Sequence, residues 1–144
     1  MNEVASTAEI LCRDKGLKFG LGSVENSKVS GSKDKMRELI LNLIENAIRY
    51  NVDGGTVSLS LTRDSSEAVI TVTDTGIGIH SDEIPHIFER FYRVDKARSR
   101  VEGGSGLGLA ICKHTAETHS GRIEATSEVG KGSVFMVYLP VNTV

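Results

Sequence analysis

The chain has 144 residues, a net charge of −2 and an isoelectric point near 6.1, with 39% hydrophobic and 25% charged residues. These values are typical of one globular domain with its own core and argue against a disordered chain. The slightly acidic balance argues against nucleic acid as a partner. No apolar run approaches the ~20 residues that span a bilayer, so we expect no membrane contact by this chain. Two cysteines are too few for a disulfide framework, which favours a cytoplasmic location.

Hydrophobic spacing predicts three helices, at residues 3–15, 32–50 and 107–119. The middle helix is the clearest, because Ser32 suits an N-cap and apolar residues recur at helical spacing between Met36 and Ile48. The same positions leave a polar face on the opposite side of this helix.

Strands are predicted where apolar and polar residues alternate and turn residues follow. The segment 17–24 reads as one strand with Leu17, Phe19 and Leu21 on one side, and a short helical turn at 81–84 is expected to be capped by Ser81. Two hairpins and a short strand complete the prediction: 57–61 with 68–73, 122–126 with 133–139, and 28–30. The fold class expected is α+β, a two-layer sandwich of one mixed five-stranded sheet with about three helices on one face.

Asn42, Asn46 and Arg49 lie at positions i, i+4 and i+7 of the helix at 32–50, so they form one stripe along it. A row of this kind is compatible with a solvated surface. It is equally compatible with a site in which amide oxygens reach Mg²⁺ and Arg49 reaches phosphate, since Mg²⁺ keeps several waters and leans on substrate phosphates. The stripe alone leaves both interpretations open.

Asp74 directly follows a predicted apolar strand and opens the segment DTGIGI at 74–79. An aspartate that only shapes a turn would fit this composition. The alternative is a buried carboxylate that accepts a hydrogen bond from an exocyclic amine, which would select adenine over guanine because guanine carries a keto group there.

A second glycine cluster, GGSGLG at 103–108, opens the last predicted helix. Glycine allows close approach of backbone to a ligand, and a helix N-terminus favours phosphate. The cluster is not a P-loop, because no Gly-Lys-Ser/Thr follows, and no βαβ unit surrounds it as in a dinucleotide-binding turn.

Between the two glycine-rich stretches, residues 80–105 form a long charged connection that we interpret as a mobile lid. Phe88 and Phe91 are either plain core residues or anchors that hold this lid on the body of the domain. Arg93 is a candidate to meet a γ-phosphate, where developing charge requires a cation. The four histidines show no metal-ligand spacing and are interpreted as structural or surface residues.

In this order, the asparagine helix, DTGIGI, the paired phenylalanines and GGSGLGLAI resemble the N, G1, F and G2 boxes of sensor histidine kinases. The resemblance covers nearly the whole chain. It implies the Bergerat ATP-binding fold, ATP and Mg²⁺ as ligands, and an ATP-dependent protein-histidine kinase activity. Residues 1–144 are then one catalytic and ATP-binding domain, and the dimerisation and phosphoacceptor domain lies elsewhere.

The resemblance also implies roles by position. Asn46 corresponds to the Mg²⁺-binding asparagine, and Asn42 to its companion near the phosphates. Arg49 corresponds to a basic phosphate contact and Arg93 to the lid arginine that serves the γ-phosphate. Asn42, Arg49 and Arg93 are therefore the expected catalytic residues.

The remaining expected contacts surround the nucleotide. Tyr50 corresponds to an aromatic residue near the adenine, and Asp74 to the carboxylate that reads it. The backbone positions implied are Gly76 and Gly78 at the adenine, and Gly104, Ser105, Gly106, Leu107 and Gly108 under the phosphates.

The same fold serves type II topoisomerases, mismatch-repair ATPases and heat-shock chaperones, which carry a glutamate as general base one turn before the metal asparagine. Asn42 stands at that position and is a poor base, while Glu45 lies about 100° around the helix. Slow hydrolysis and transfer to a protein acceptor are therefore favoured. Two departures from the family, Ser32 in place of an acidic residue and Ser120 in place of a glycine, fall outside the expected site.

The implied partners are a separate dimerisation and phosphoacceptor domain and a response regulator. The fragment itself is expected to be a monomer, and its parent a homodimeric, membrane-anchored sensor. Two other functions stay open: a nucleotide-dependent docking module without catalysis, and a serine kinase of the anti-sigma type on the same fold.

Overall fold

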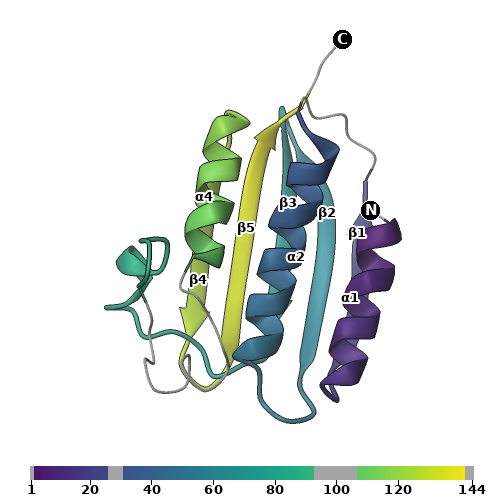
Figure 1. Cartoon of the computed structure of the whole chain (residues 1–144), viewed down its shortest axis with the longest axis vertical. Coiled ribbons are helices and arrows are strands. Elements are labelled where there is room, and N and C mark those ends of the chain that lie inside the picture. Colours follow the sequence, from purple (N-terminus) through teal and green to yellow (C-terminus); the bar gives the residue numbers. More distant parts are fainter. Residues whose placement is uncertain (1, 26–30, 93–106, 142–144) are drawn as a thin grey trace.

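The computed structural model describes residues 2–25, 31–92 and 107–141. Three helices lie on one face of a five-stranded sheet (Figure 1): α1 (Asn2–Asp14), α2 (Lys33–Arg49) and α4 (Gly108–Thr118). The strands are β1 (Lys18–Val24), β2 (Thr56–Asp64), β3 (Glu67–Asp74), β4 (Arg122–Glu128) and β5 (Gly132–Pro140). The predicted two-layer α+β sandwich is confirmed.

The order of strands in the sheet is β1-β2-β3-β5-β4. The β1–β2 pair is parallel, and the other three pairs are antiparallel, so the sheet is mixed as expected. The end of β3 lies inside the sheet, where Asp74 stands opposite Val57 of β2 and Ser133 of β5. The topology therefore brings β5 next to Asp74, although 59 residues separate Ser133 from Asp74 in the sequence.

Helix α2 supplies much of the core. The Ser32 hydroxyl caps its first turn by accepting a hydrogen bond from the Lys35 N–H at 3.2 Å. The residues that it buries lie at helical spacing, as the sequence predicts: Leu39, Ile40, Leu43, Ile44 and Ala47. The C-terminal end of α2, the end of β3 and the start of α4 lie toward the same end of the sandwich (Figure 1).

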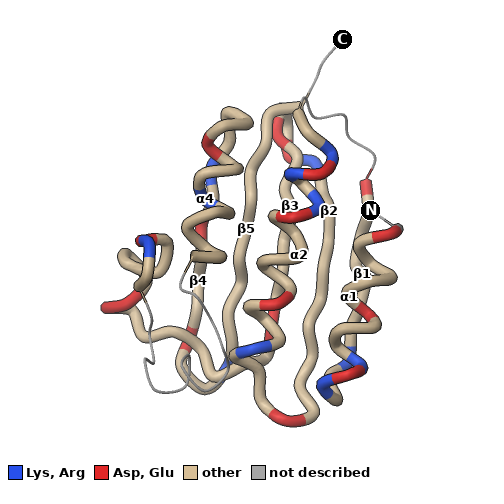
Figure 2. Tube along the Cα trace, viewed as in Figure 1, with Lys and Arg blue, Asp and Glu red and all other residues tan. Residues whose placement is uncertain are grey.

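Charged residues of both signs are mixed over the helices, whereas β5 has none and β3 has one only at each end (Figure 2). No helix in the described part of the chain is long and apolar enough to cross a membrane.

The structure differs from two local expectations, and a third lies outside the described residues. Leu21 is 45% exposed, so β1 does not keep the expected alternation; β1 is an edge strand, and its register shifts between Leu21 and Val24. The predicted cap at Ser81 is wrong, because the short 3₁₀ helix η1 (Ile84–His86) begins after Glu83 without a side-chain cap. The strand expected at 28–30 lies outside the described residues.

Candidate functional site

Asp74 is a buried carboxylate with only 7% of its surface exposed. Its Oδ1 accepts hydrogen bonds from the Gly76 N–H at 2.8 Å and the Ser133 N–H at 3.2 Å. Burial raises the pKa of Asp74, and these two backbone bonds oppose that rise. No hydrogen bond from a described residue reaches Oδ2, so one acceptor oxygen is left for an amine donor.

The 74–79 segment is fastened to the β4–β5 hairpin. The Ile77 carbonyl accepts a hydrogen bond from the Gly130 N–H at 2.9 Å, and the Ile79 N–H donates to the Ser127 hydroxyl at 2.7 Å. Gly78 has φ +79°, and a Cβ there would collide with the Glu128 carbonyl. Glycine is therefore required at 78 by the packing of the loop itself.

A second set of bonds fastens the same segment to the end of α2. The Tyr50 carbonyl accepts a hydrogen bond from the Ile77 N–H at 3.0 Å and lies so close to Gly76 that a Cβ there would collide with it. Asn51, only 8% exposed, donates to the Thr56 carbonyl at 2.9 Å and accepts from the Thr75 hydroxyl at 3.2 Å.

Four residues without a predicted site role make these bonds: Asn51, Thr75, Ser127 and Ser133. Only Asn51 has a signal in the sequence, because it lies between a helix end and the pair Gly54-Gly55, where bonds from side chains to backbone are common. Together these residues hold Asp74 against the C-terminal end of α2.

The polar stripe of α2 is half-buried. Asn42, Asn46, Arg49 and Tyr50 all have intermediate exposure. The neighbouring Glu45 is exposed, so the stripe is distinct from the solvated face of the helix. Arg49 and Tyr50 lie at the C-terminal end of α2, and Asn42 and Asn46 lie two turns and one turn before that end.

A buried contact joins α4 to α2. Cys112 of α4 is fully buried, and its thiol donates a hydrogen bond to the Leu39 carbonyl of α2 at 3.6 Å. Burial and the nearby Glu38 charge raise the pKa of Cys112 to about 12, and the neighbouring Asn42 amide opposes this rise.

Helix α4 begins at the same end of the domain. Leu107 occupies its N-cap position, and no described side chain caps the first turn. A Cβ at Gly108 would meet no described atom within 4 Å. Packing among the described residues therefore does not explain the glycine at 108. The predicted site residues Arg93, Gly104, Ser105 and Gly106 lie outside the described residues.

The two phenylalanines do not act as a pair. Phe88 packs edge-on against Phe135 of the core with ring centres 6.2 Å apart. Phe91 is 70% exposed and has φ +64°, so its expected role as an anchor is wrong. Next to the half-buried Phe88, Ile87 is buried, with 4% of its surface exposed. The rest of the expected lid, from residue 93, lies outside the described residues.

The described residues contain no group of three His, Cys, Asp or Glu side chains that could hold a metal ion. A metal at this site would depend on neutral amide oxygens and on ligand phosphates.

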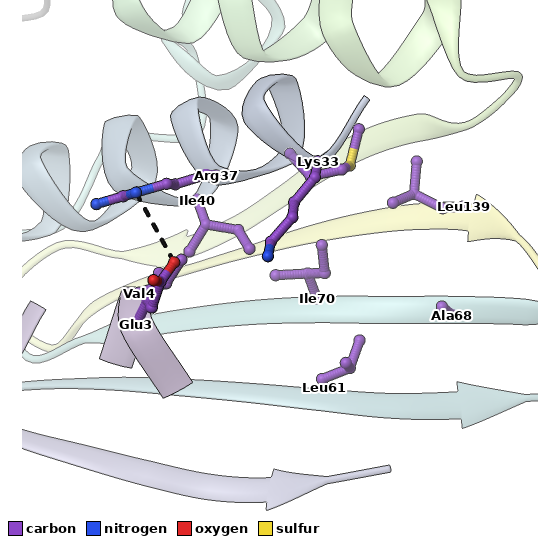
Figure 3. Close-up of a pocket in the computed structure, with 10 residues that line it drawn as sticks. Glu3, Val4, Lys33, Arg37, Ile40, Leu61, Ala68, Ile70 and Leu139 are labelled. Carbon is purple, nitrogen blue, oxygen red and sulfur yellow. Dashed lines mark ion pairs between the residues drawn. The ribbon is translucent and has the colours of Figure 1, made fainter. Parts of the chain in front are cut away.

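A separate pocket of about 170 Å³ lies at the opposite end of the sandwich, between α1, α2 and the sheet (Figure 3). Its walls are mainly apolar, with Lys33 extended across it and the Glu3–Arg37 ion pair at 3.9 Å on its edge. None of the residues predicted for the nucleotide lines it.

Comparison with known proteins decides the family. The model of the histidine kinase-, DNA gyrase B- and HSP90-like ATPases matches residues 31–143, well over half of the chain. The chain belongs to this family of ATPases. Its relatives within the family include the sensor histidine kinase RppB of Synechocystis, 49% identical over 114 residues, which are 79% of this chain and 25% of RppB.

Other proteins that are similar to this chain are also named as histidine kinases. The chain is 40% identical to the sensor-like histidine kinase SenX3 of Mycolicibacterium smegmatis over 140 residues, 97% of this chain and 36% of SenX3. The solved structure of the mycobacterial sensor histidine kinase MprB superposes with a TM-score of 0.84 at 30% identity, covering 100% of this chain and 97% of that one. The chain spans only about a quarter to a third of the length of the curated relatives.

Proposed function

We propose that this domain binds ATP with Mg²⁺ and transfers the γ-phosphate to a histidine on a separate dimerisation domain in two-component signalling. The observation that carries the proposal is the buried Asp74 carboxylate, with Oδ1 held by two backbone N–H groups, in a family member whose relatives are named sensor histidine kinases. A related chain of known structure, ShkA, has been solved in complex with the ATP analogue AMPPNP.

Asp74 selects adenine as the base. Its Oδ1 is occupied by two backbone donors, and Oδ2 is available to accept from the exocyclic amine of adenine. Guanine would bring a carbonyl oxygen to this acceptor, which leaves a buried polar group unpaired and costs roughly 1–3 kcal/mol. Tyr50, Gly76 and Gly78 form the surroundings of the base.

The phosphate end lies between α2 and the start of α4. Asn46, with Asn42, presents amide groups suited to a hard cation that is also held by phosphate oxygens, and Mg²⁺ there would neutralise charge on the phosphates. Arg49 supplies a further positive charge. The N-terminal end of α4 at Gly108 is proposed to lie close to the phosphates, and Arg93, Gly104, Ser105, Gly106 and Leu107 are proposed to complete the contact.

Transfer is favoured over hydrolysis because the site has no general base for water at residue 42. Asn42 carries a neutral amide, which does not take a proton from water. In the transfer step the bond between the γ-phosphorus and its bridging oxygen breaks, ADP leaves, and a P–N bond forms on the acceptor imidazole. The imidazole proton leaves to a base that we place on the acceptor domain.

The first experiment is calorimetry of the domain with Mg-ATP and Mg-GTP. Binding of ATP with GTP at least tenfold weaker is expected, and equal affinities would remove Asp74 as the selecting group. The second experiment adds the matching dimerisation domain with γ-labelled ATP. Label that is lost in acid and stable in base identifies phosphohistidine.

The same assay tests the alternatives. Binding without any transfer supports a docking module, and an acid-stable product supports a serine kinase. We further propose that the parent is a membrane-anchored homodimer that passes its phosphate to a response regulator.

A further inference from the structure

Thr75, the residue between Asp74 and Gly76, joins three segments of the chain through its side-chain hydroxyl. The hydroxyl oxygen accepts a hydrogen bond at 2.8 Å from the N–H of Thr56, where β2 begins. The hydroxyl proton is donated to Asn51 Oδ1 at 3.2 Å, with the Thr56 carbonyl at 3.5 Å as a weaker second acceptor. Because a hydroxyl has one proton, Thr75 does not donate to a ligand while these bonds are in place.

The acceptor that Thr75 meets is itself held rigidly. Asn51 is buried, its Oδ1 accepts from the Val52 N–H at 2.8 Å, and its Nδ2 donates to the Thr56 carbonyl at 2.9 Å. A backbone N–H can only donate and a carbonyl can only accept, so these two partners determine which end of the amide is oxygen. A Cβ at Gly55 would collide with both Asn51 Oδ1 and Thr75 Oγ1, so space around this contact is restricted as well.

The backbone on either side of Thr75 carries the carboxylate proposed to read the base and the bonds that place it. The Gly76 N–H donates to Asp74 Oδ1 at 2.8 Å. The next N–H, that of Ile77, donates to the carbonyl of Tyr50, the C-cap residue of α2, at 3.0 Å. A shift of Thr75 would therefore move the carboxylate relative to the end of α2.

We propose that the Thr75 hydroxyl is a positioning group that holds the Asp74 carboxylate in place for the exocyclic amine of adenine. The proposal rests on the proposed function and makes its selection of the base more specific. Discrimination for adenine then depends on a hydroxyl whose bonds are all made within the protein. Loss of this hydroxyl weakens the contact with the amine and leaves the contacts with the phosphates unchanged.

Two substitutions separate the hydroxyl from the rest of the Thr75 side chain. Thr75→Val keeps the branched shape without the hydroxyl, whereas Thr75→Ser keeps the hydroxyl. Thr75 is exposed, so neither substitution alters the core. Thr71→Val is the matched control, because Thr71 lies in β3 and its hydroxyl makes no hydrogen bond within the described part of the chain.

The test is calorimetry with Mg-ATP and with the Mg²⁺ complex of purine riboside triphosphate, which is ATP without the exocyclic amine. Wild type is expected to bind ATP roughly tenfold more tightly than the analogue, and Thr75→Val to bind ATP about three- to tenfold more weakly than wild type does. The affinity of Thr75→Val for the analogue should stay close to that of wild type. Thr75→Ser restores most of the ATP affinity, and Thr71→Val changes neither affinity. Equal weakening of both nucleotides in Thr75→Val, or no weakening of ATP, overturns the proposal.

Hydrogen exchange of the domain without nucleotide gives a second measurement. The amides of Gly76 and Ile77 are expected to exchange faster in Thr75→Val than in wild type, relative to the amide of Val72 in the core of β3, and Thr75→Ser should restore the wild-type rates. Unchanged exchange at both amides overturns the proposal.

The two measurements also separate this proposal from the proposed function. If wild type binds neither nucleotide, the proposed function fails, and hydrogen exchange alone decides whether the Thr75 hydroxyl holds the loop. If wild type binds both nucleotides equally, the reading of adenine by Asp74 fails and this proposal fails with it. Transfer of label from ATP to the dimerisation domain then still decides the kinase function.

Discussion

At the scale of single residues, the buried carboxylate of Asp74 serves the proposed site but makes the folded domain less stable. Burial raises its pKa, so the folded state favours the protonated form. The protonated carboxyl group of Asp74 is therefore compatible with a stable fold at low pH. This contribution to stability is lost as the pH rises through the pKa of Asp74 in the folded state, because the carboxyl group then ionises. At neutral pH the ionised carboxylate therefore lowers the stability of the domain.

Asp74→Asn is expected to raise the thermal midpoint at pH 7, because the amide keeps an oxygen for the Gly76 and Ser133 N–H groups without carrying the buried charge. The gain should shrink as the pH falls through the folded pKa and vanish below about pH 4, the ordinary range of aspartate. Calorimetric melting at several pH values measures it, with the exposed Asp53→Asn as control.

The same substitution should weaken Mg-ATP binding roughly tenfold or more, because a buried hydrogen bond to a charged group contributes about 1.5–3 kcal/mol. A variant with lower stability at pH 7 and unchanged affinity would contradict both parts of this account of Asp74.

Gly108 gives a second prediction for one residue. A Cβ at this position meets nothing within 4 Å among the described atoms, and alanine is a better helix former than glycine by roughly 0.5–1 kcal/mol. Gly108→Ala is expected to keep or raise the thermal midpoint and to weaken Mg-ATP binding roughly tenfold, as the phosphates need close access to the backbone. Fluorescence titration with a labelled ATP measures the affinity.

Gly20→Ala is the matched control for Gly108→Ala, because a Cβ at Gly20 of the edge strand β1 also meets no atom within 4 Å. It should leave the affinity unchanged. Equal affinities for both variants would show that the glycine at 108 has no part in nucleotide binding.

At the scale of elements, the end of α4 carries a local strain. The Gly121 N–H donates to the Ala116 carbonyl at 2.8 Å, which closes the helix through a left-handed residue. That residue is Ser120, with φ +63°. An L-residue in this conformation costs roughly 1–2 kcal/mol.

Ser120→Gly is therefore expected to stabilise the domain by about 1 kcal/mol, or a rise of roughly 2–5 °C in melting temperature, without a change in ATP affinity. Ser66→Gly, at an exposed serine without positive φ, is the control and should not stabilise. A fall in melting temperature for Ser120→Gly would mean that the serine side chain makes a compensating contact.

At the scale of the whole molecule, nucleotide binding should stabilise the fold, because the proposed site joins elements from both halves of the chain. Helix α2 comes from the first half of the chain, and Asp74, the β4–β5 hairpin and α4 come from the second. A ligand at 100 times its Kd adds about 2.7 kcal/mol of stability. Mg-ATP at that excess should raise the thermal midpoint by several degrees, and Mg-GTP at equal concentration much less.

Thermal melts with each nucleotide test this directly. A similar rise with both would mean that the domain recognises the phosphates without reading the base. A rise with neither would count against the site as a whole.

The sequence by itself determined the helices, the hairpins and the position of Asp74 at a strand end. These are local properties: apolar spacing sets which face of α2 is buried, and glycine chemistry marks the loop at 74–79. Their order along the chain also carried the family resemblance, which the comparisons confirm.

Only the tertiary structure decided which groups meet at the site. Ser133 reaches Asp74 because β5 lies next to β3, and Cys112 reaches Leu39 because α4 packs beside α2. Phe91 is exposed although its spacing from Phe88 suggested a buried pair. Contacts of this kind depend on the order of strands and the packing of helices, which bring together residues that are far apart in the chain and leave no periodic signal in it.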